Sequence, residues 1–114
     1  MKKKIKYKNS SLTYETGLSS TVTREDNIVD WEAFTFITNI KIDKKDDVRI
    51  VFPKLLGQAM KEILDMGDIY IRLYLHTREI DQFLLDDYKL VILSLGFEQV
   101  SSSSEGIMFV FGSD

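Results

Sequence analysis

The stretch from Phe52 to Met66 limits the fold more than any other part of the sequence, because its apolar residues follow a helical repeat without a miss. They are Phe52, Leu55, Leu56, Ala59, Met60, Ile63 and Leu64. Spacings of three and four residues place these side chains on one side of an α-helix. Pro53 suits the first turn of such a helix, and Gly67 suits its C-terminal end. The stretch therefore predicts an amphipathic helix that packs against a sheet or another helix.

The residues after this helix predict a strand, a second helix and a final strand. Apolar residues alternate with polar and aromatic ones over Ile69–Leu75, as in a half-buried strand. A second helix is expected to begin at Thr77 as its N-cap and to end at Gly96. Its apolar stripe consists of Ile80, Phe83, Leu84, Tyr88, Val91, Ile92 and Leu95. The unbroken apolar run that follows Gly106 predicts a strand covered on both faces.

The first half of the chain carries strand signals. A long strand is expected over Trp31–Ile42, and two weaker strands are expected over residues 4–8 and 12–22. Four apolar side chains are expected on one face of the long strand: Phe34, Phe36, Ile40 and Ile42. The order of elements is therefore β-β-β-α-β-α-β. It predicts an α/β (α+β) fold, with a mixed, mostly antiparallel sheet and two packed helices.

The length and composition predict one cytoplasmic domain. With 114 residues, the chain is expected to form a single domain over residues 1–114. It has no cysteine, which excludes thiolate catalysis, disulfide bonds and Cys-ligated zinc. No stretch is apolar over the length that a membrane span needs, and no apolar signal segment follows the N-terminal lysines.

Charge is distributed unevenly along the sequence. Five of the 15 basic residues lie in the first eight positions, whereas all 18 acidic residues lie beyond them, and the net charge is −3. An acidic body argues against a broad nucleic-acid surface. It is compatible with a protein partner or with mimicry of a polyanion, and also with a surface that only confers solubility. The lysines that alternate with Ile5 and Tyr7 suit an edge strand protected from aggregation.

The order and spacing of these elements resemble the GNAT (GCN5-related) N-acetyltransferase family over about residues 31–112. The segment 39–43 resembles the strand that lies beside acetyl-CoA in that family. Leu55 and Leu56 resemble the paired leucines of its cofactor helix, and the string LGFE at 95–98 resembles the end of its last helix. The resemblance implies a GNAT-like fold, with acetyl-CoA as the cofactor if the chain is an enzyme.

The chain departs from the GNAT pattern at the positions where chemistry is expected. GNAT enzymes hold the CoA pyrophosphate with backbone amides of a glycine-containing loop at a helix N-terminus. Here Asp47 stands where that pattern has Arg or Gln, and Ile50 and Phe52 stand at its glycine positions. A carboxylate repels phosphate, and bulky side chains obstruct the approach of the backbone. Ile92 takes the place of the frequent general-acid tyrosine, with Tyr88 one turn earlier.

The segment that precedes Phe52 allows two interpretations. In one, it is the loop that leads into the helix. In the other, Lys44 and Lys45 form a hairpin turn and Val48–Val51 is an additional strand. The additional strand would close the place where a pyrophosphate would bind.

If the chain is an enzyme, the resemblance implies cofactor contacts from seven residues: Asn39, Ile40, Ile42, Val48, Arg49, Ile50 and Phe52. Tyr88 and His76, the only histidine, are then the candidates for proton transfer. The ordinary alternatives are a loop position for His76 and a core position for Tyr88. One histidine among scattered carboxylates predicts no metal site.

A scaffold without these chemical features favours a non-catalytic GNAT-like protein that binds a protein partner and needs no cofactor. The size and composition suit a regulator or inhibitor from a phage or another mobile element. The alternative is a divergent acetyl-CoA-dependent N-acetyltransferase. An open cleft between the strands Trp31–Ile42 and Ile69–Leu75 would favour the enzyme, whereas Ile50, Phe52 or an extra strand in that cleft would argue against it. The sequence sets no oligomeric state.

Overall fold

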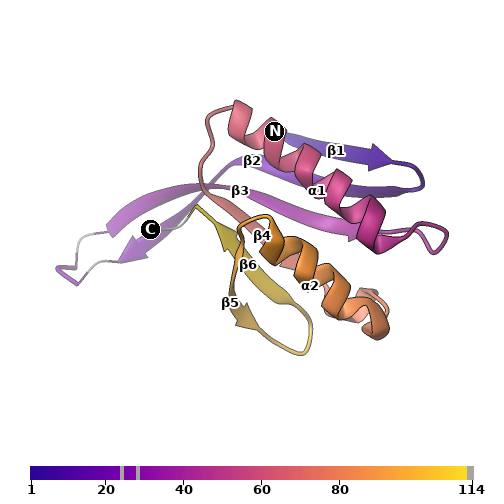
Figure 1. The fold of residues 1–114 in the computed structure, drawn as a ribbon. Coiled ribbons are helices and arrows are strands. Elements are labelled where there is room, and N and C mark those ends of the chain that lie inside the picture. Colours follow the sequence, from indigo (N-terminus) through magenta and orange to yellow (C-terminus); the bar gives the residue numbers. More distant parts are fainter. Residues whose placement is uncertain (24, 28, 113–114) are drawn as a thin grey trace.

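The computed structural model describes residues 1–23, 25–27 and 29–112, which form a six-stranded sheet with two α-helices (Figure 1). The strand order is β1-β2-β3-β4-β6-β5, and every neighbouring pair is antiparallel except β3 and β4. The elements are β1 (Lys2–Tyr7), β2 (Ser10–Thr23), β3 (Val29–Lys41), α1 (Val48–Asp65), β4 (Ile71–Leu75), η1 (Thr77–Glu79), η2 (Gln82–Leu84), α2 (Leu85–Ser94), β5 (Glu98–Ser102) and β6 (Ile107–Phe111). The predicted fold class is confirmed.

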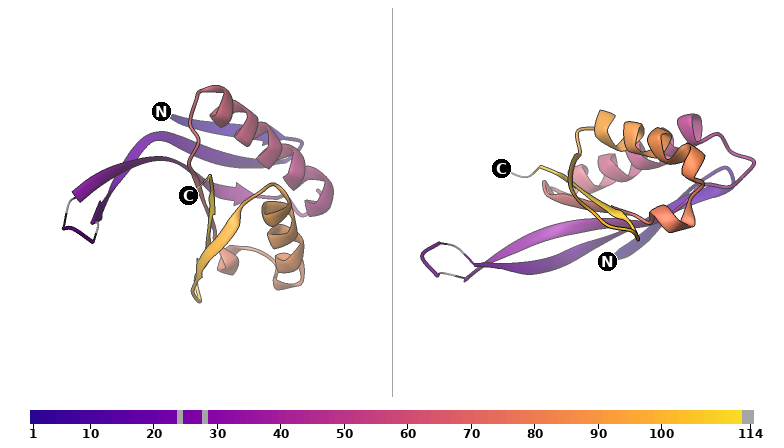
Figure 2. Two further views of the ribbon diagram at one scale, coloured as in Figure 1. Left: turned by 60° about the vertical axis from the view of Figure 1, so that its left-hand side comes forward. Right: turned by 90° about the horizontal axis from the view of Figure 1, so that it is seen from below.

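Both α-helices pack on one face of the sheet, as the right-hand panel of Figure 2 shows. The apolar stripe that predicted the first helix is the buried side of α1, except that Leu64 is exposed. The core between α1 and the sheet contains fully buried side chains from four strands: Leu12 and Tyr14 of β2, Ile37 of β3, Ile71 and Leu73 of β4, and Phe109 of β6. Burial of this much apolar surface is the main force that holds the layers together.

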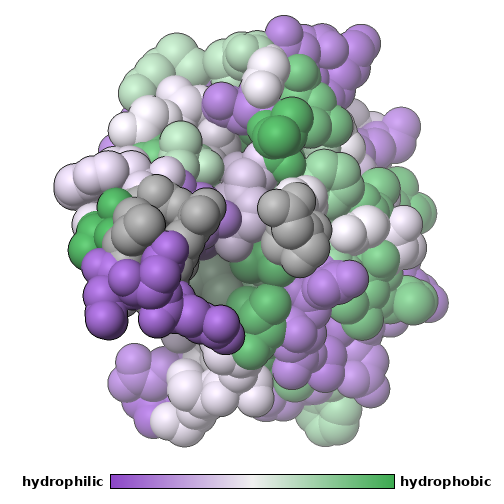
Figure 3. All heavy atoms as spheres, turned by 90° about the vertical axis from the view of Figure 1, so that its left-hand side faces the viewer, coloured by the Kyte–Doolittle hydropathy of each residue, from purple (hydrophilic) through white to green (hydrophobic). Residues whose placement is uncertain are grey.

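Strands β2 and β3 extend beyond the rest of the sheet as a two-stranded arm (Figures 1 and 2). Pairs from Leu18–Phe34 out to Thr23–Val29 hold the arm together. Trp31 lies on the arm with 73% of its surface exposed, and so it is not a core residue. Figure 3 views the molecule from this side and shows apolar side chains reaching the surface among polar ones.

Strand β3 changes its inward-facing side at Asn39, whose φ of 53° is left-handed. Before this residue, Thr35 and Ile37 are buried on the helical side, so Phe34 and Phe36 point to the other side. After it, Ile40 and Ile42 pack against the core. The expectation that all four of these apolar residues share a face is therefore wrong, because a left-handed residue breaks the alternation of a strand.

The structure corrects three element assignments. Val48–Val51 is neither a loop nor a strand but the first turn of α1. The segment expected to be one helix from Thr77 is two short 3₁₀ turns followed by α2, because Asp81 accepts the Phe83 N–H and starts the second turn. β5 was missed because all its side chains are exposed, which leaves no apolar alternation to detect.

Of the helices in the described ranges, none is long and apolar enough to cross a bilayer.

Candidate binding cleft

A cleft opens where β3 and β4 separate. Their parallel pairing covers three residue pairs, from Thr35–Ile71 to Ile37–Leu73. Beyond Ile37, β3 continues to Lys41 beside β2, and β4 continues to Leu75 beside β6. The left-handed turn at Asn39 lies at the start of this separation. The edge of β3 past Ile37 therefore faces an opening instead of a neighbouring strand.

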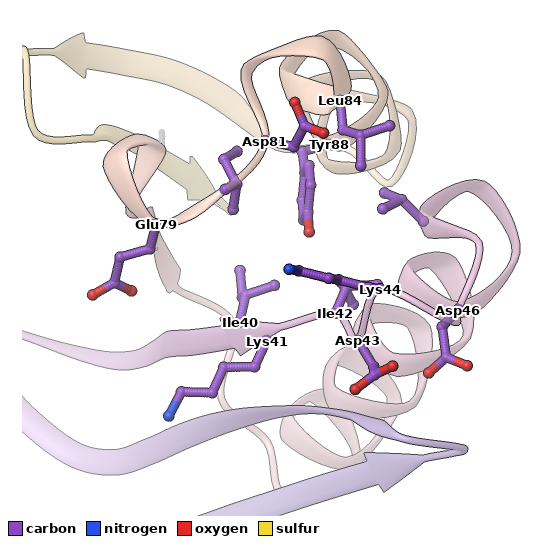
Figure 4. Close-up of a pocket in the computed structure, with 12 residues that line it drawn as sticks. Ile40, Lys41, Ile42, Asp43, Lys44, Asp46, Glu79, Asp81, Leu84 and Tyr88 are labelled. Atoms are coloured by element: carbon purple, nitrogen blue, oxygen red, sulfur yellow. The ribbon is translucent and has the colours of Figure 1, made fainter.

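The cleft has a volume of about 540 Å³ and lies between the end of β3, the loop before α1 and the segment from η1 to α2 (Figure 4). Five apolar side chains form part of its lining: Ile40, Ile42, Val48, Ile80 and Leu84. Seven polar or charged residues complete it: Lys41, Asp43, Lys44, Asp46, Glu79, Asp81 and Tyr88. Four of these are carboxylates and two are lysines, so the lining is negative on balance, with the Lys44 amine pointing into the cleft (Figure 4).

The loop between β3 and α1 uses its own carboxylates to bind backbone amides. Asp43 accepts the N–H of Lys45 at 2.9 Å. Asp46 accepts the N–H of Asn9 at 3.1 Å and the hydroxyl of Ser10 at 2.6 Å, which ties the loop to the turn between β1 and β2. The Ser10 hydroxyl oxygen in turn accepts the N–H of Asp43 at 2.9 Å. These amides are consequently not free to bind a phosphate.

Asp47 caps the N-terminus of α1, the place where a GNAT enzyme would hold a pyrophosphate. Its carboxylate accepts the backbone N–H of Arg49 at 3.0 Å and lies 3.4 Å from the Arg49 guanidinium. The backbone hydrogen bond from Arg49, followed by the side-chain bond, lowers the pKa of the Asp47 carboxyl below its usual value. A negative charge therefore already occupies the positive end of the helix dipole.

Tyr88 reaches the cleft from α2 (Figure 4). Its ring is 3% exposed and packs against Phe52, with the ring centroids 5.3 Å apart. Burial, together with the negative charge of Asp81, raises the pKa of the Tyr88 phenol above its usual value. The phenol thus stays protonated near neutral pH and can donate a hydrogen bond to a ligand in the cleft.

His76 does not join Tyr88 in the cleft. It follows β4, and its ring packs edge-on against Tyr74 at 4.6 Å between centroids. Tyr74 lies between the buried residues Leu73 and Leu75, so it points away from the helices. The two candidates for proton transfer are therefore not brought together.

The candidate cofactor residues divide into two groups. Ile40, Ile42 and Val48 line the cleft. Four others lie outside its lining: Asn39, Arg49, Ile50 and Phe52. Ile50 is 54% exposed on the outer side of α1, and Phe52 is fully buried beneath Tyr88. Neither side chain fills the cleft, and none of the strands in the described ranges crosses it.

Sequence reasoning missed Lys44 and Asp46 as cleft residues, and it considered Glu79 and Asp81 only as carboxylates near His76. The dense carboxylates in the string IDKKDD before a helix are a usable signal, because Asp residues there commonly bind nearby amides. Glu79 and Asp81 gave no such signal, since the 3₁₀ turns that carry them were read as one helix. Within the described ranges, no three acidic or histidine side chains gather as metal ligands would.

Neither a protein-family model nor a curated protein matches the chain. Among solved structures, it is similar to the crystal structure of a "putative acetyltransferase from Agrobacterium tumefaciens". The two are 18% identical, with a TM-score of 0.46, and the match covers 86% of this chain and 73% of the other. A similarity of this degree concerns the outline of the fold and not the chemistry of the cleft.

Proposed function

We propose that this chain is a non-catalytic binding protein whose cleft takes an extended, positively charged segment of a protein partner. The observation that carries the proposal is that the Asp47 carboxylate caps the N-terminus of α1, where a GNAT enzyme would bind phosphate. The cleft beside it is lined by four carboxylates. These carboxylates would repel the diphosphate of CoA, whereas they would attract a lysine or arginine side chain. A regulator or inhibitor, including one encoded by a phage or other mobile element, would act by such binding.

The backbone geometry of the cleft suits an extended ligand. Past Ile37, the edge of β3 has no pairing with β4, so a peptide can add there as a strand through main-chain hydrogen bonds. Side chains of an added strand alternate in direction. One set would contact the apolar lining around Ile40 and Ile80, and the other would lie towards Glu79 and Asp81.

The proposal is tested by titration calorimetry with short synthetic peptides. A peptide of alternating lysine and valine is expected to bind, and its binding should weaken as salt is added. A matched peptide of alternating glutamate and valine is expected not to bind. Equal affinity for the two peptides, or no binding by either, would contradict the proposal.

A matched pair of variants locates the binding. Glu79→Gln removes one carboxylate from the cleft. It is expected to raise the dissociation constant of the lysine peptide roughly twofold to fivefold. Asp65→Asn makes the same change of charge at the far end of α1, about 25 Å along the helix axis from Val48, which lines the cleft. The Asp65→Asn variant should bind as the unmodified chain does.

The second candidate is a divergent acetyl-CoA-dependent N-acetyltransferase, and the unfilled cleft with the Tyr88 phenol favours it. In that case, excess acetyl-CoA should raise the melting temperature, because a ligand that binds the native state stabilises it. Tyr88→Phe should then lower the acetylation rate more than it lowers acetyl-CoA binding. An unchanged melting temperature at millimolar acetyl-CoA would dismiss the enzyme and leave the peptide proposal standing.

A further inference from the structure

The face of the sheet opposite the helices is uncovered in the described part of the chain (Figure 2, right). Strand alternation determines which side chains point there. On β1, Lys3 binds Glu62 of α1 and Ile5 is in the core, so Lys2, Lys4 and Lys6 point to the uncovered face. On β3 and β4 the same reasoning assigns Phe34, Phe36, Arg72 and Tyr74 to it, and on β6 it assigns Met108 and Val110.

The strand register aligns one row of residues across this face. Lys2 pairs with Glu15, Glu15 with Phe36, and Phe36 with Arg72. Arg72 pairs with Val110, and Val110 pairs with Glu98 at the far edge. Directly paired residues project from the same face of a sheet. The row therefore begins with Lys2 at one edge and ends with Glu98 at the other, with Glu15, Phe36, Arg72 and the buried Val110 between them.

Arg72 is fixed at the centre of the uncovered face. Its guanidinium lies 4.0 Å from the centroid of the Phe34 ring, donates to the Ser20 hydroxyl at 3.1 Å and lies 3.8 Å from Glu32. Only a quarter of its side chain is exposed. Arginine, aromatic residues and methionine are the side chains that protein interfaces favour at their centres.

We propose that a second copy of this chain covers the uncovered face, related by a two-fold axis that runs parallel to the strands between β3 and β4. Rotation about this axis places β1 over β5 of the second copy and β3 over its β4. Lys2 then faces Glu98 of the partner subunit, and Phe36 faces Arg72 of the partner subunit. Two sheets that pack in this way lie about 10 Å apart, within reach of the side chains of both.

Charge complementarity is the reason to choose a second copy over another occupant. A two-fold interface brings each surface against itself, so like charges would meet unless the basic and acidic ends lie on opposite sides of the axis. Within the row no like charges meet across the axis, because Lys2 faces Glu98 of the partner subunit, Glu15 faces the partner's Val110 and Phe36 faces the partner's Arg72. A single-stranded nucleic acid would suit the lysines and aromatic rings, but it gives no role to Glu98 at the other edge.

The test is sedimentation of the untagged chain over a range of protein concentrations. The unmodified chain is expected to form a dimer. Lys2→Glu and Glu98→Lys are each expected to raise its dissociation constant on the order of tenfold, since each change affects two symmetric pairs. The combined variant should return to within about twofold of the unmodified chain, because it recreates both pairs with reversed charge.

The control is Lys61→Glu, which makes the same change of charge on the exposed side of α1 and should leave the dimer unchanged. Melting temperatures of all variants confirm folding. A monomer at every concentration overturns the inference, as does a dimer that responds to neither reversal. Binding of an oligothymidine by a monomeric chain, lost in Lys2→Glu, would assign the face to nucleic acid and also overturn it. The helical side and its cleft are not involved, so the result is independent of peptide binding.

Discussion

The two helices border the same cleft but are anchored to the molecule in different ways. α1 has 18 residues, the Asp47 cap at its start and eight buried side chains. α2 has 10 residues, no side-chain cap and three buried side chains. It exposes Leu90 and Leu93, and its start is supported by the charges of Asp86 and Asp87 in the first turn. The two sides of the cleft therefore differ in how firmly they are held.

This difference indicates which side of the cleft can adapt to a ligand. Regions with few buried contacts open at lower free energy than the core. The α2 side, which carries Tyr88, Asp81 and Glu79, is the side of low contact density, whereas α1 and its loop are fixed by capping and packing. We expect binding to protect amides of η1, η2 and α2 from hydrogen exchange more than those of α1.

The largest expected effect is the difference in unfolding free energy between a substitution in α1 and one in α2. Leu56→Ala in α1 removes a fully buried side chain and should lower the free energy of unfolding by about 2–5 kcal/mol. Leu90→Ala in α2, at a position 68% exposed, should change it by less than about 0.5 kcal/mol. Urea denaturation of both variants measures their free energies of unfolding. Similar losses of free energy at the two positions would contradict the difference between the helices.

The next effect concerns the bend that separates β3 from β4. Asn39→Val forces a β-branched residue into a left-handed conformation and should cost about 1–2 kcal/mol. Asn39→Gly should cost much less, because glycine adopts this conformation without a steric penalty. Denaturation of the two variants tests the bend, and equal losses would show that the conformation at 39 is not required.

A smaller, pH-dependent effect tests the cap of α1. The folded-state pKa of Asp47 lies below its unfolded value, so its stabilisation is fully present above the unfolded value and is lost as the pH falls through the folded value. Asp47→Ala should lower the melting temperature by a few degrees at pH 7, and the difference should shrink in acid. Asp47→Ser keeps a hydrogen-bond acceptor without the charge, so its melting temperature at pH 7 should lie between those of Asp47→Ala and the unmodified chain. A difference that grows in acid would contradict the assignment.

The smallest expected effect lies on the α2 side. Tyr88→Phe keeps the ring that packs against Phe52 and removes only the hydroxyl that points into the cleft. Its stability should differ by less than about 0.5 kcal/mol, as measured by urea denaturation. A loss of several kcal/mol would mean that the hydroxyl is part of the core and not of the cleft.

The sequence predicted those elements of the fold whose buried side chains repeat with the period of a helix or a strand. Leu55, Leu56 and Ile63 marked α1, and the alternation through Ile71 and Leu73 marked β4, because both elements bury one side against the core. β5 was not predictable, since its residues 98–102 are all exposed and its pairing with β6 depends on backbone hydrogen bonds. Backbone pairing leaves no trace in side-chain polarity.

The cleft was less predictable than the fold. Its opening depends on the left-handed φ of Asn39, which no repeat in the sequence reveals. The sequence predicted two obstacles to phosphate, the Asp47 carboxylate and the bulk of Ile50 and Phe52, but the side chains of Ile50 and Phe52 point to solvent and into the core. The side chain that does occupy the helix N-terminus is that of Asp47. The cleft residues Glu79 and Asp81 come from a segment whose helical pattern hid two separate turns.

The three residue pairs between β3 and β4 also bear on how the chain reaches its native state. They are the seam between a half made of β1, β2, β3 and α1 and a half made of β4, α2, β5 and β6. The β1–β2, β2–β3 and β5–β6 hairpins close over short loops, whereas the seam joins positions about 36 residues apart, such as Phe36 and Arg72, and β4 pairs with β6 over a similar separation. Contacts of long sequence separation carry the larger entropic cost and form more slowly. The seam and the β4–β6 pairing are thus expected to form late in refolding, so the cleft beside the seam should be among the last features to acquire its shape.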